Sequence, residues 1–575
     1  MPSATYTGPS NVISARSVDA VRPLKVICLG AGVSGILAAI RFPERVKNLD
    51  LVIYEKNEEI GGTWFENKYP GCACDIPAHN YQLSFESNTT WTSFYAKAPE
   101  ILEYWKKVVD KYGVRKYIKL SIKAVEARWD EKTSKWTVKL VNLKTGETFS
   151  DSADVLFTGT GTLNEWKMPA IPGLEDYTGK MMHSAVWDAD YKYQGKKVAV
   201  VGAGSSGIQI VPNIQPDVER LDHYVRGRTW IATTIGMAEV QKRNPNGGNF
   251  DYTPEEIKAW QDNPESYLVY RKRLEAELQT GHGITQRGSA IQLEIRKLFT
   301  QLMTGRLAAK PQVAEHLLPN FPPLCKRLTP GPGYLEALTQ QNVDVIPTPI
   351  ERITPTGILT TDGQHREVDA IICATGFNTS FQGRFPIYGV GGVKLANKWK
   401  SFPSTYLSMT TSFFPNFFMS LGPNAGLGWG NLLIVIEGFV EYAAQCMARM
   451  QVQNILSMQP KPRAEENFVK FCDAYFAGTV FSEECSSWYK TGGKNGRVSA
   501  LWPGSGLHAI KALKEPRWED FEYTYVDGNE LGWLGDGSAV ADVGEEDESG
   551  KWYYLEGGNM LHEPLAEKMV VGANE

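Results

Sequence analysis

Cysteine is scarce in this sequence, with eight residues in a chain of 575. Small secreted domains that rely on disulfide bonds carry much denser cysteine, so that class of protein is excluded. Four of the eight, Cys28, Cys325, Cys373 and Cys446, lie in apolar or helix-like stretches, where cysteine packs as a small hydrophobic side chain. Together with an amino terminus that lacks a signal-peptide pattern, this predicts a cytoplasmic protein.

The chain also lacks an excess of either charge and any long hydrophobic run. Its 60 Lys and Arg residues nearly balance 65 Asp and Glu residues, giving a formal net charge of −5. Nucleic-acid and anionic-membrane partners are therefore not expected. The longest apolar stretch, residues 26–40, is shorter than the roughly 18 residues that cross a bilayer, so no membrane segment is expected. No metal site is predicted, and a monomer is favoured over an oligomer.

A motif that occurs twice is the strongest feature that is present. KVICLGAGVSG at residues 25–35 and KVAVVGAGSSG at residues 197–207 are nearly the same string. In each copy a β-type run leads into three glycines spaced G-x-G-x-x-G, and a helix-like run follows, as in βαβ units that bind dinucleotides. The first glycine permits a tight turn, the second lets pyrophosphate approach the backbone, and the third lets the helix pack on the strand.

The first copy is followed by an acidic residue. Its glycines are Gly30, Gly32 and Gly35, and the next β-type run ends at Glu55, about 20 residues beyond the last glycine. A carboxylate at this point accepts hydrogen bonds from the hydroxyls of an adenosine ribose. The first unit is therefore predicted to bind FAD or NAD rather than NADP.

The second copy is followed by arginine instead. The residues that begin its helix-like run are Gly202, Gly204, Ser205, Ser206 and Gly207. Where the first copy has Glu55, this copy has Arg226, Arg228 and Thr229. Guanidinium binds a ribose 2′-phosphate with two hydrogen bonds, whereas a carboxylate would repel it, so NADPH is the predicted ligand. Arginines that serve only the end of the strand are the alternative.

A unit for FAD and a unit for NADPH in one chain imply hydride transfer from NADPH to FAD. Residues 157–161 and 369–376, two β-type runs that end in Thr-Gly, are similar to the crossing strands of two-domain flavoprotein reductases and monooxygenases. A disulfide reductase would also need a redox-active cysteine pair. The one close pair, Cys72 and Cys74, has a spacing that strains a disulfide, so this alternative is disfavoured.

Two longer motifs narrow the choice of enzyme. GGTWFENKYPGCACD at residues 61–75 and YTGKMMHSAVWD at residues 177–188 resemble the two signatures of type I Baeyer-Villiger monooxygenases, which are class B flavoprotein monooxygenases. The resemblance extends over about residues 24–523, and residues 501–523 resemble a subgroup that is frequent among fungal sequences. The sequence departs from the second signature at Tyr177, where the family usually has phenylalanine.

The resemblance implies a reaction. Enzymes of this family use FAD, NADPH and O2 to insert one oxygen atom beside a ketone carbonyl through a C4a-peroxyflavin, which gives an ester or lactone. That peroxide attacks only while deprotonated, so the chemistry needs a fixed cation such as arginine beside it. The alternatives are a flavin N- or S-monooxygenase, which uses the hydroperoxyflavin and needs no such arginine, and a non-catalytic dinucleotide-binding protein. The sequence does not indicate whether the ketone is linear, cyclic or polycyclic.

The resemblance also implies roles for individual residues. Arg327 would be the catalytic arginine, and Asp75 would hold it in place through a buried ion pair. The motif residues expected to contact the cofactors are Thr63, Trp64, Asp75, Arg228, Thr229, Lys326, Arg327 and Trp488. His183 and Trp187, in the second signature, are expected to have a structural or conformational role.

The predicted fold is α/β, with two Rossmann-like dinucleotide-binding domains and a helical insertion in the NADP domain. The predicted parts are a polar arm (1–23), an FAD domain (24–164 and 377–575), an NADP domain (165–232 and 323–376) and the insertion (233–322). Helical spacing predicts two core-facing stripes in the insertion; they are Tyr267, Tyr270, Leu274 and Leu278, and Ile291, Ile295, Leu298 and Leu302. A long apolar helix over residues 432–447 and a solvated acidic turn at residues 545–548 are also predicted.

Overall fold

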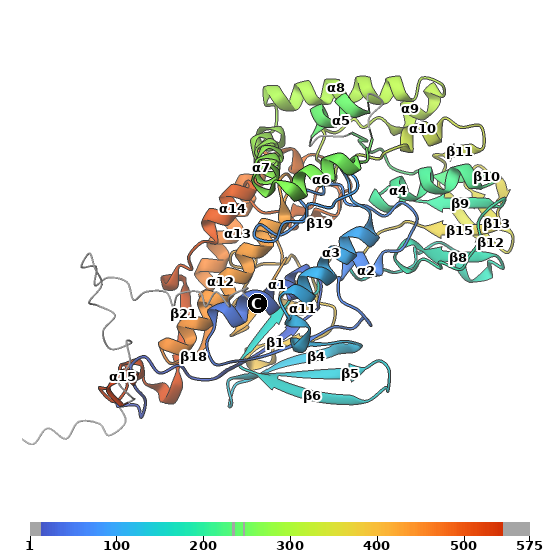
Figure 1. The fold of residues 1–575 in the computed structure, drawn as a ribbon. Helices are drawn as coiled ribbons and strands as arrows, with labels where there is room; N and C mark the ends of the chain where they lie inside the picture. The colour runs from blue at the N-terminus through green and yellow to red at the C-terminus, as the bar shows by residue number, and fades with distance from the viewer. Residues whose placement is uncertain (1–12, 233–235, 245–247, 544–575) are drawn as a thin grey trace, which may run out of the picture.

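The computed structural model describes residues 13–232, 236–244 and 248–543. Two five-stranded parallel sheets, with helices packed around them, form a mixed α/β protein as predicted. Figure 1 shows the first sheet near the centre of the molecule, around β1 (Leu24–Leu29), and the second sheet at the right, around β9 (Lys197–Val201) and β15 (Ala370–Cys373). Apart from Lys25 and Lys197 near their starts, the central strands are apolar, because both faces of such sheets are covered.

The first sheet has the strand order β17-β7-β1-β2-β3. Its strands are β1 (Leu24–Leu29), β2 (Leu49–Tyr54), β3 (Ile118–Lys119), β7 (Val155–Thr158) and β17 (Phe417–Met419). Helices α1 (Val33–Arg45) and α12 (Leu432–Val452) pack against each other beside it. Helix α12 continues past the predicted end at residue 447, because Met450 and Gln451 still pack in the core.

The second sheet has the strand order β11-β10-β9-β15-β8. Its strands are β8 (Lys180–His183), β9 (Lys197–Val201), β10 (Arg220–Tyr224), β11 (Val343–Ile346) and β15 (Ala370–Cys373), and helices α4 (Ser205–Ile214) and α10 (Tyr334–Leu338) pack against each other beside it. In both sheets the strand before the glycines pairs in parallel with the strand before the predicted ribose-binding residue. The two loops of each unit therefore leave the sheet side by side at its carboxyl edge.

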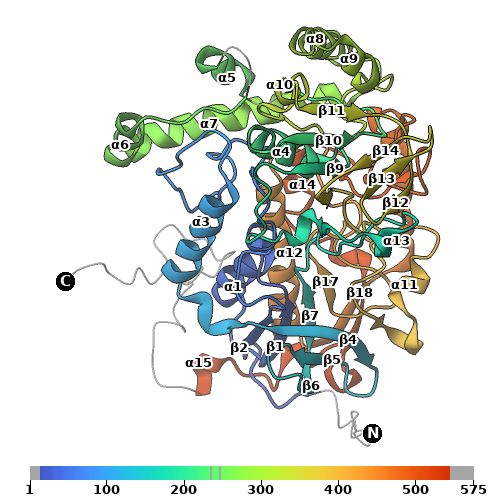
Figure 2. The same ribbon diagram turned by 90° about the vertical axis from the view of Figure 1, so that its right-hand side faces the viewer.

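The remaining elements surround these sheets. One smaller sheet consists of β4 (Ile122–Asp130), β5 (Lys135–Asn142), β6 (Thr148–Ala153) and β16 (Ile387–Tyr388). Another consists of β12 (Ile350–Thr354), β13 (Gly357–Thr360) and β14 (His365–Glu367). The strands β18 (Ile455–Pro460) and β21 (Phe521–Tyr525) form a pair, as do β19 (Lys490–Thr491) and β20 (Arg497–Val498). The remaining helices outside the insertion are α2 (Thr63–Glu66), α3 (Ala98–Lys111), α11 (Leu395–Lys398), α13 (Pro462–Ala477), α14 (Gly506–Ala512) and α15 (Val540–Val543). Figure 2 shows β4–β6 below the first sheet and β12–β14 at the edge of the second.

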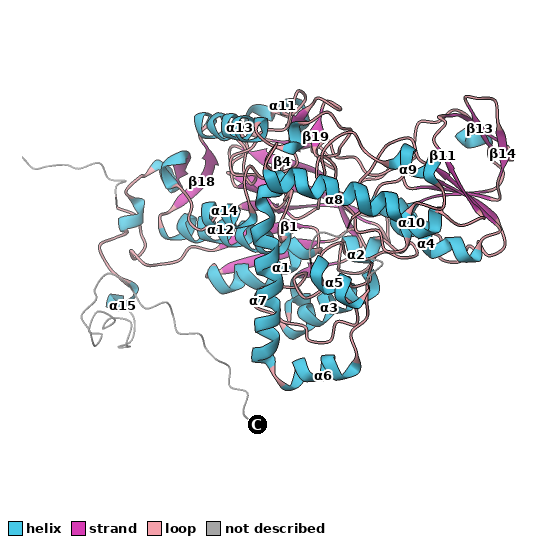
Figure 3. Cartoon of the chain, turned by 90° about the horizontal axis from the view of Figure 1, so that it is seen from above, coloured by secondary structure: helices cyan, strands magenta, loops and turns pink. Residues whose placement is uncertain are grey.

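The region predicted as an insertion is helical. It contains α5 (Met237–Arg243), α6 (Pro254–Asp262), α7 (Pro264–Thr280), α8 (Ala290–Arg306) and α9 (Pro311–Leu317), and Figure 3 shows α7 and α8 running in different directions. Helix α6 begins with a capping box between Thr253 and Glu256, in which each side chain satisfies the other residue's backbone N–H. The stripe predicted on α7 is confirmed at Tyr267, Leu274 and Leu278, which are buried.

The stripe predicted on α8 is confirmed in part. Ile291 is 41% exposed, and the buried line of this helix is Gln292, Phe299 and Met303. Ile295, Leu298 and Leu302 of the predicted stripe are partly buried and pack against the core beside that line, and Ile291 is the exposed member. The Phe299 ring meets the Trp230 ring of the second unit, which selects this face.

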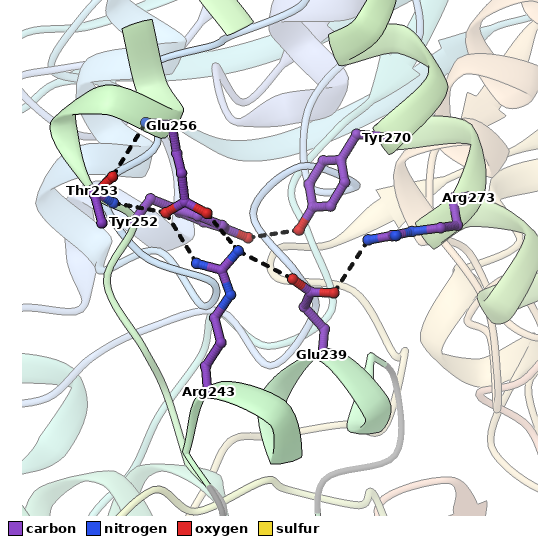
Figure 4. A network of polar contacts seen from close by, with 7 residues as sticks. All are labelled: Glu239, Arg243, Tyr252, Thr253, Glu256, Tyr270 and Arg273. Carbon is purple, nitrogen blue, oxygen red and sulfur yellow. Dashed lines mark hydrogen bonds and ion pairs between the residues drawn. The ribbon is translucent and has the colours of Figure 1, made fainter. Parts of the chain in front are cut away.

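An ion-pair network joins the first three helices of the insertion (Figure 4). Arg243 of α5 pairs with Glu239 on its own helix and with Glu256 of α6. Glu239 also pairs with Arg273 of α7, at 3.2 Å. Exposed pairs contribute little individually, but a shared network fixes the relative positions of short helices.

The insertion also contacts both units. On α7, Glu275 accepts hydrogen bonds from the side chains of Asn80 and Asn431 in the first unit, at 2.9 and 3.2 Å. On α8, Arg306 forms two hydrogen bonds to Glu336 beside the second sheet. The insertion therefore bridges the two nucleotide-binding units, and the domain boundaries given above stay a prediction.

The described residues of the predicted amino-terminal arm, 13–23, pack against the rest of the fold. Arg16 donates to the Gln451 carbonyl at 3.2 Å, and Arg22 donates to the Ile455 carbonyl at 2.6 Å. The acidic run at residues 545–548 lies outside the described residues. Among the helices of the described ranges, none combines the length and apolar character that a bilayer crossing requires.

Candidate active site

The first glycine loop has the geometry that a dinucleotide needs. Gly30 follows β1 with a φ of 102°, and a Cβ there would lie 2.6 Å from the Gly159 carbonyl oxygen, so only glycine fits this turn. A Cβ on Gly35 would overlap the Gly30 carbonyl, which keeps helix and strand in close contact. At Gly32 the nearest atom to such a Cβ is the Gly62 Cα, 3.5 Å away. The backbone at the second glycine is therefore approachable, as FAD binding requires.

Glu55 sits behind this loop and is 4% exposed. Its carboxylate accepts hydrogen bonds from the Ala31 N–H at 2.7 Å and the Asn57 N–H at 2.8 Å. Burial raises the pKa of Glu55, and these two backbone donors oppose the rise. Each oxygen keeps a second lone pair for a ribose hydroxyl. Glu55 thus both shapes the glycine loop and presents an acceptor beside it.

The residues of the first signature lie against the same loop. A Cβ on Gly62 would come within 3.0 Å of the Gly32 Cα, so the two backbones nearly touch. Thr63 begins α2 directly after this contact and is exposed, whereas Trp64 is buried and donates its indole N–H to the Tyr81 hydroxyl at 3.1 Å. Thr63 and Trp64 therefore lie next to the first glycine loop, and their contact with a cofactor stays a prediction.

A cavity of 1590 Å³ opens at the carboxyl edge of the second sheet. The predicted residues that line it are Gly202, Gly204, Ser205, Arg228, Thr229, Lys326, Arg327 and Trp488. Ser206 is not among the lining residues, and neither is Gly207, where a Cβ would overlap the Gly202 carbonyl. No atom lies within 4 Å of a Cβ built on Gly204. Most of the predicted NADP residues therefore share one cavity, and the second glycine is open to it.

Positive charge is concentrated at one part of this cavity. The lining cations Arg226, Arg228, Lys326 and Lys494 lie there, and Lys326 donates to the Arg228 carbonyl at 2.9 Å. Burial lowers the pKa of Lys326, and the charges of Lys494 and Arg226 lower it further. Such mutual repulsion is relieved when an anion binds. Lys494 was not among the predicted residues, and its signal in the sequence is the glycine-rich turn shortly after Trp488.

Arg228 and Arg226 differ in their contacts. The Nη1 atom of Arg228 donates to the carbonyls of Glu315 and Leu318 at the end of α9, which leaves Nε and Nη2 available. Within the described residues, no hydrogen bond or ion pair involves Arg226. Both side chains are exposed at the mouth of the cavity. Arg228 is therefore fixed with two donors to spare, as a bidentate phosphate contact needs.

Arg327 and Asp75 form the predicted ion pair across 252 residues of sequence. The Arg327 Nε lies 2.8 Å from Asp75 Oδ2, and Nη2 lies 2.7 Å from Oδ1. The pair is half-buried rather than buried, with the Arg327 side chain 33% exposed, because Arg327 borders the cavity. Burial acts to lower the pKa of Arg327, but the Asp75 carboxylate outweighs it and the net shift is upward. The guanidinium therefore stays charged.

The first signature also reaches the second unit, which explains how Asp75 meets Arg327. Tyr69 donates to the Gln209 side chain of α4 at 2.8 Å, and Gln209 donates to the Ala73 carbonyl at 2.9 Å. These contacts hold residues 61–75 between the two glycine loops. Sequence spacing carried no signal for Gln209, which lies outside both signatures.

Comparisons with known proteins agree with this geometry. Residues 23–239 match the model of the family described as flavin-binding monooxygenase-like. The FAD-binding monooxygenase tazF of Aspergillus terreus is 39% identical over 520 residues, which cover 90% of this chain and 92% of that protein. A Baeyer-Villiger monooxygenase of Pseudomonas aeruginosa is 35% identical over 489 residues, covering 84% and 88%. The crystal structure of cyclohexanone monooxygenase from Rhodococcus sp. Phi1 bound to NADP+ superposes with a TM-score of 0.75 at 26% identity, covering 88% of this chain and 100% of that one.

The chain belongs to the Baeyer-Villiger monooxygenases. It is an FAD- and NADPH-dependent monooxygenase, as the two glycine loops predicted. The likeness to a fungal relative over most of both chains fits the subgroup that residues 501–523 indicated.

Residues of the second signature, 177–188, make packing contacts and hydrogen bonds in this Baeyer-Villiger monooxygenase. The Tyr177 hydroxyl, absent from the usual phenylalanine, donates to the Val368 carbonyl at 2.8 Å, so the departure is accommodated. His183 stacks on the Trp166 ring and accepts a hydrogen bond from the Ala185 N–H. Trp187 meets the Tyr193 ring. These contacts are of the structural kind that the resemblance implies.

One cysteine prediction is wrong. Cys325 is not a free hydrophobic side chain but forms a disulfide with Cys485, with a Cα–Cα distance of 6.3 Å. The two cysteines are 160 residues apart, so only the fold brings them together. Cys72 and Cys74 remain free and buried, and burial raises the pKa of Cys72 to about 11. Such thiols stay protonated, which agrees with the exclusion of a disulfide reductase.

Proposed function

We propose that this Baeyer-Villiger monooxygenase converts ketones to esters or lactones with Arg327 as its catalytic cation and Asp75 as the residue that orients it. The net reaction is ketone, NADPH, O2 and H+ to ester, NADP+ and water. When FAD is bound and has been reduced by NADPH, it would react with O2, and one oxygen atom of O2 would be inserted beside the ketone carbonyl. The observation that carries the proposal is the bidentate Arg327–Asp75 pair at the wall of the cavity.

Arg327 is suited to stabilise developing negative charge. Its raised pKa keeps it cationic, and two hydrogen bonds to Asp75 fix the guanidinium plane before substrate arrives. A cation held in place in this way needs no reorganisation when charge develops, so its effect is larger than in water. A monooxygenase that acts on nitrogen or sulfur through a protonated oxidant would not need this fixed charge.

The remaining residues divide between the two cofactors. The first glycine loop, Glu55 and the start of α2 would hold FAD, with the Glu55 carboxylate accepting from the adenosine ribose. Arg228, Thr229 and Lys326 would hold the 2′-phosphate of NADPH, and Trp488 would line the nicotinamide end. The cytoplasm, where NADPH is regenerated, is the proposed location.

Product analysis tests the proposal. The FAD-loaded protein, supplied with NADPH and a panel of linear and cyclic ketones under air, should form esters or lactones that gas chromatography identifies. Oxidation of amines or sulfides without any ester would favour the N- or S-monooxygenase, and no NADPH consumption with any ketone would indicate a binding protein.

The Arg327→Ala variant should separate the chemistry from cofactor binding. Removing one preorganised charge costs on the order of 3 to 4 kcal/mol, so ester formation should fall roughly a hundredfold or more while the protein stays folded and yellow. Asp75→Ala should lose less, because the charge remains and only its orientation is freed. An Arg327→Ala enzyme with the parent ester yield would remove Arg327 from the mechanism.

A further inference from the structure

The Cys325–Cys485 disulfide joins two walls of the cavity. Cys325 directly precedes Lys326 and Arg327 in the chain, and Cys485 lies three residues before Trp488. Residues 326–327 and 483–488 both line the cavity. The bond therefore connects the segment that carries the catalytic cation to the segment that carries the indole.

The second of these segments has few other attachments. Among the described residues, the backbone of 484–488 makes one hydrogen bond to other backbone, from the Lys490 N–H to the Ser487 carbonyl at 3.2 Å, and this contact is local. Its neighbour Glu483 is held by an ion pair to Arg287 at 2.7 Å. Beyond that point, the attachments of residues 484–488 within the described structure are the disulfide and the packing of the Trp488 ring against the core.

The first segment is held in an unusual conformation beside the bond. Leu324 has a φ of 71°, a left-handed value that residues with a Cβ rarely adopt. Such a conformation persists where the surroundings constrain it, and the neighbouring Cys325 is fixed covalently. Cleavage of the bond would release both segments at once.

We propose that Cys325 and Cys485 form a reversible thiol–disulfide site whose oxidised form holds the Trp488 segment against Lys326 and Arg327 and strengthens retention of NADP+. The reductant would be a dithiol: its two sulfurs form a new disulfide, the protein S–S bond breaks, and two electrons and two protons pass to the cysteine sulfurs. This inference rests on the proposed roles of Lys326, Arg327 and Trp488 in holding the nicotinamide cofactor.

Access to the site runs through the cavity. Cys325 is fully buried and Cys485 is 2% exposed, but Cys485 is one of the cavity-lining residues. A bound nicotinamide cofactor would therefore shield the disulfide from a dithiol. In the proposed cytoplasmic location, disulfides are characteristically transient and redox-sensing, which fits a bond whose Cys485 lines the cavity.

Thiol counting tests the bond itself. The FAD-loaded enzyme, purified without reductant and then denatured, should show six reactive thiols, and eight after dithiothreitol. On the native enzyme, saturating NADP+ should slow the appearance of the two additional thiols. Eight thiols without reductant, or release of the two thiols at the same rate with and without NADP+, would overturn the proposal.

Ligand binding tests the coupling. Dithiothreitol should raise the Kd for NADP+ roughly fivefold, because a segment must then be ordered on binding. The Cys325→Ala/Cys485→Ala enzyme should show the same raised Kd without any response to dithiothreitol, and Cys446→Ala, which removes a buried thiol of α12, should respond as the parent does. An unchanged Kd after verified reduction would overturn the coupling alone. Absence of NADP+ binding in both redox forms would overturn the proposed function as well.

Discussion

The two glycine loops share a backbone plan and differ in what surrounds them. At the first glycine of each, a Cβ would lie 2.6 Å from a carbonyl oxygen in one unit and 2.5 Å in the other. At the second glycine, Gly32 faces the Gly62 backbone at 3.5 Å, whereas Gly204 has no neighbour within 4 Å of such a Cβ. The same turn thus lies in an enclosed setting in the first unit and an open one in the second.

The residues that follow the loops differ in the same way. Glu55 is 4% exposed and bonded to two backbone N–H groups, whereas Arg226 and Arg228 stand exposed at the mouth of the cavity. An enclosed site suits FAD, which stays with the enzyme through each turnover. An open site suits NADPH, which is oxidised and replaced. The difference shows that the shared motif fixes the turn that a pyrophosphate approaches, while the surrounding residues determine how open that turn is.

The largest expected effect comes from filling the first glycine of each loop. Gly30→Val should abolish FAD binding and lower the yield of folded protein, because the side chain meets the Gly159 carbonyl and the backbone has a left-handed φ. Gly202→Val meets the Ala374 carbonyl in the same way and should abolish NADPH binding. The flavin absorbance spectrum and NADPH titration separate the two. If Gly202→Val also lost its flavin, the two units would not be independent.

Glu55→Gln should weaken FAD binding roughly ten- to a hundredfold. The carboxylate accepts from both Ala31 and Asn57, and an amide offers only one oxygen, so one buried backbone donor loses its partner at about 1 to 3 kcal/mol. Flavin release during dialysis measures the loss. Glu44→Gln, at a half-exposed position on α1, is the matched control and should keep its flavin. Equal retention by both variants would assign Glu55 to packing alone.

Replacing the arginines of the second unit tests the difference in charge between the two sites. Arg228→Ala should raise the KM for NADPH roughly tenfold or more and change the KM for NADH little, since a charge-assisted contact is worth about 1.5 to 3 kcal/mol. Arg226→Ala should produce a smaller rise, because no hydrogen bond or ion pair from the described residues fixes its side chain. If Arg228→Ala weakened both cofactors equally, its bonds to the Glu315 and Leu318 carbonyls would be its main role.

The features that could be predicted from the sequence are those that depend on residues close together in the chain. Both glycine loops, the parallel strands around them and the helices of the insertion follow from local spacing, because a βαβ turn is fixed by residues close in sequence. The Arg327–Asp75 pair was reached only through the resemblance, since no spacing rule connects residues that lie 252 positions apart.

The failures share a physical cause. On α8, Ile291 of the predicted stripe is exposed, whereas Phe299, which lies beside the stripe, is buried against the Trp230 ring of another unit. The Cys325–Cys485 bond and the cation Lys494 likewise depend on which loops meet at the cavity. Local periodicity indicates that a helix has an apolar face, but tertiary contacts determine how deeply each residue of that face is buried.

The smallest change, Gly204→Ala, tests most directly whether the second glycine loop is open to a ligand. Gly204→Ala adds one methyl group where no protein atom lies within 4 Å, so folding and flavin content should be unchanged. The methyl projects where the second glycine of such a loop lets a pyrophosphate approach, and the KM for NADPH should therefore rise severalfold. Gly32→Ala is the matched variant: its methyl would meet the Gly62 Cα at 3.5 Å, an ordinary contact, and should weaken FAD without affecting NADPH. If Gly204→Ala had the same KM for NADPH as the parent enzyme, the dinucleotide would not pass along this loop. The two units would then share a fold but not a mode of dinucleotide binding.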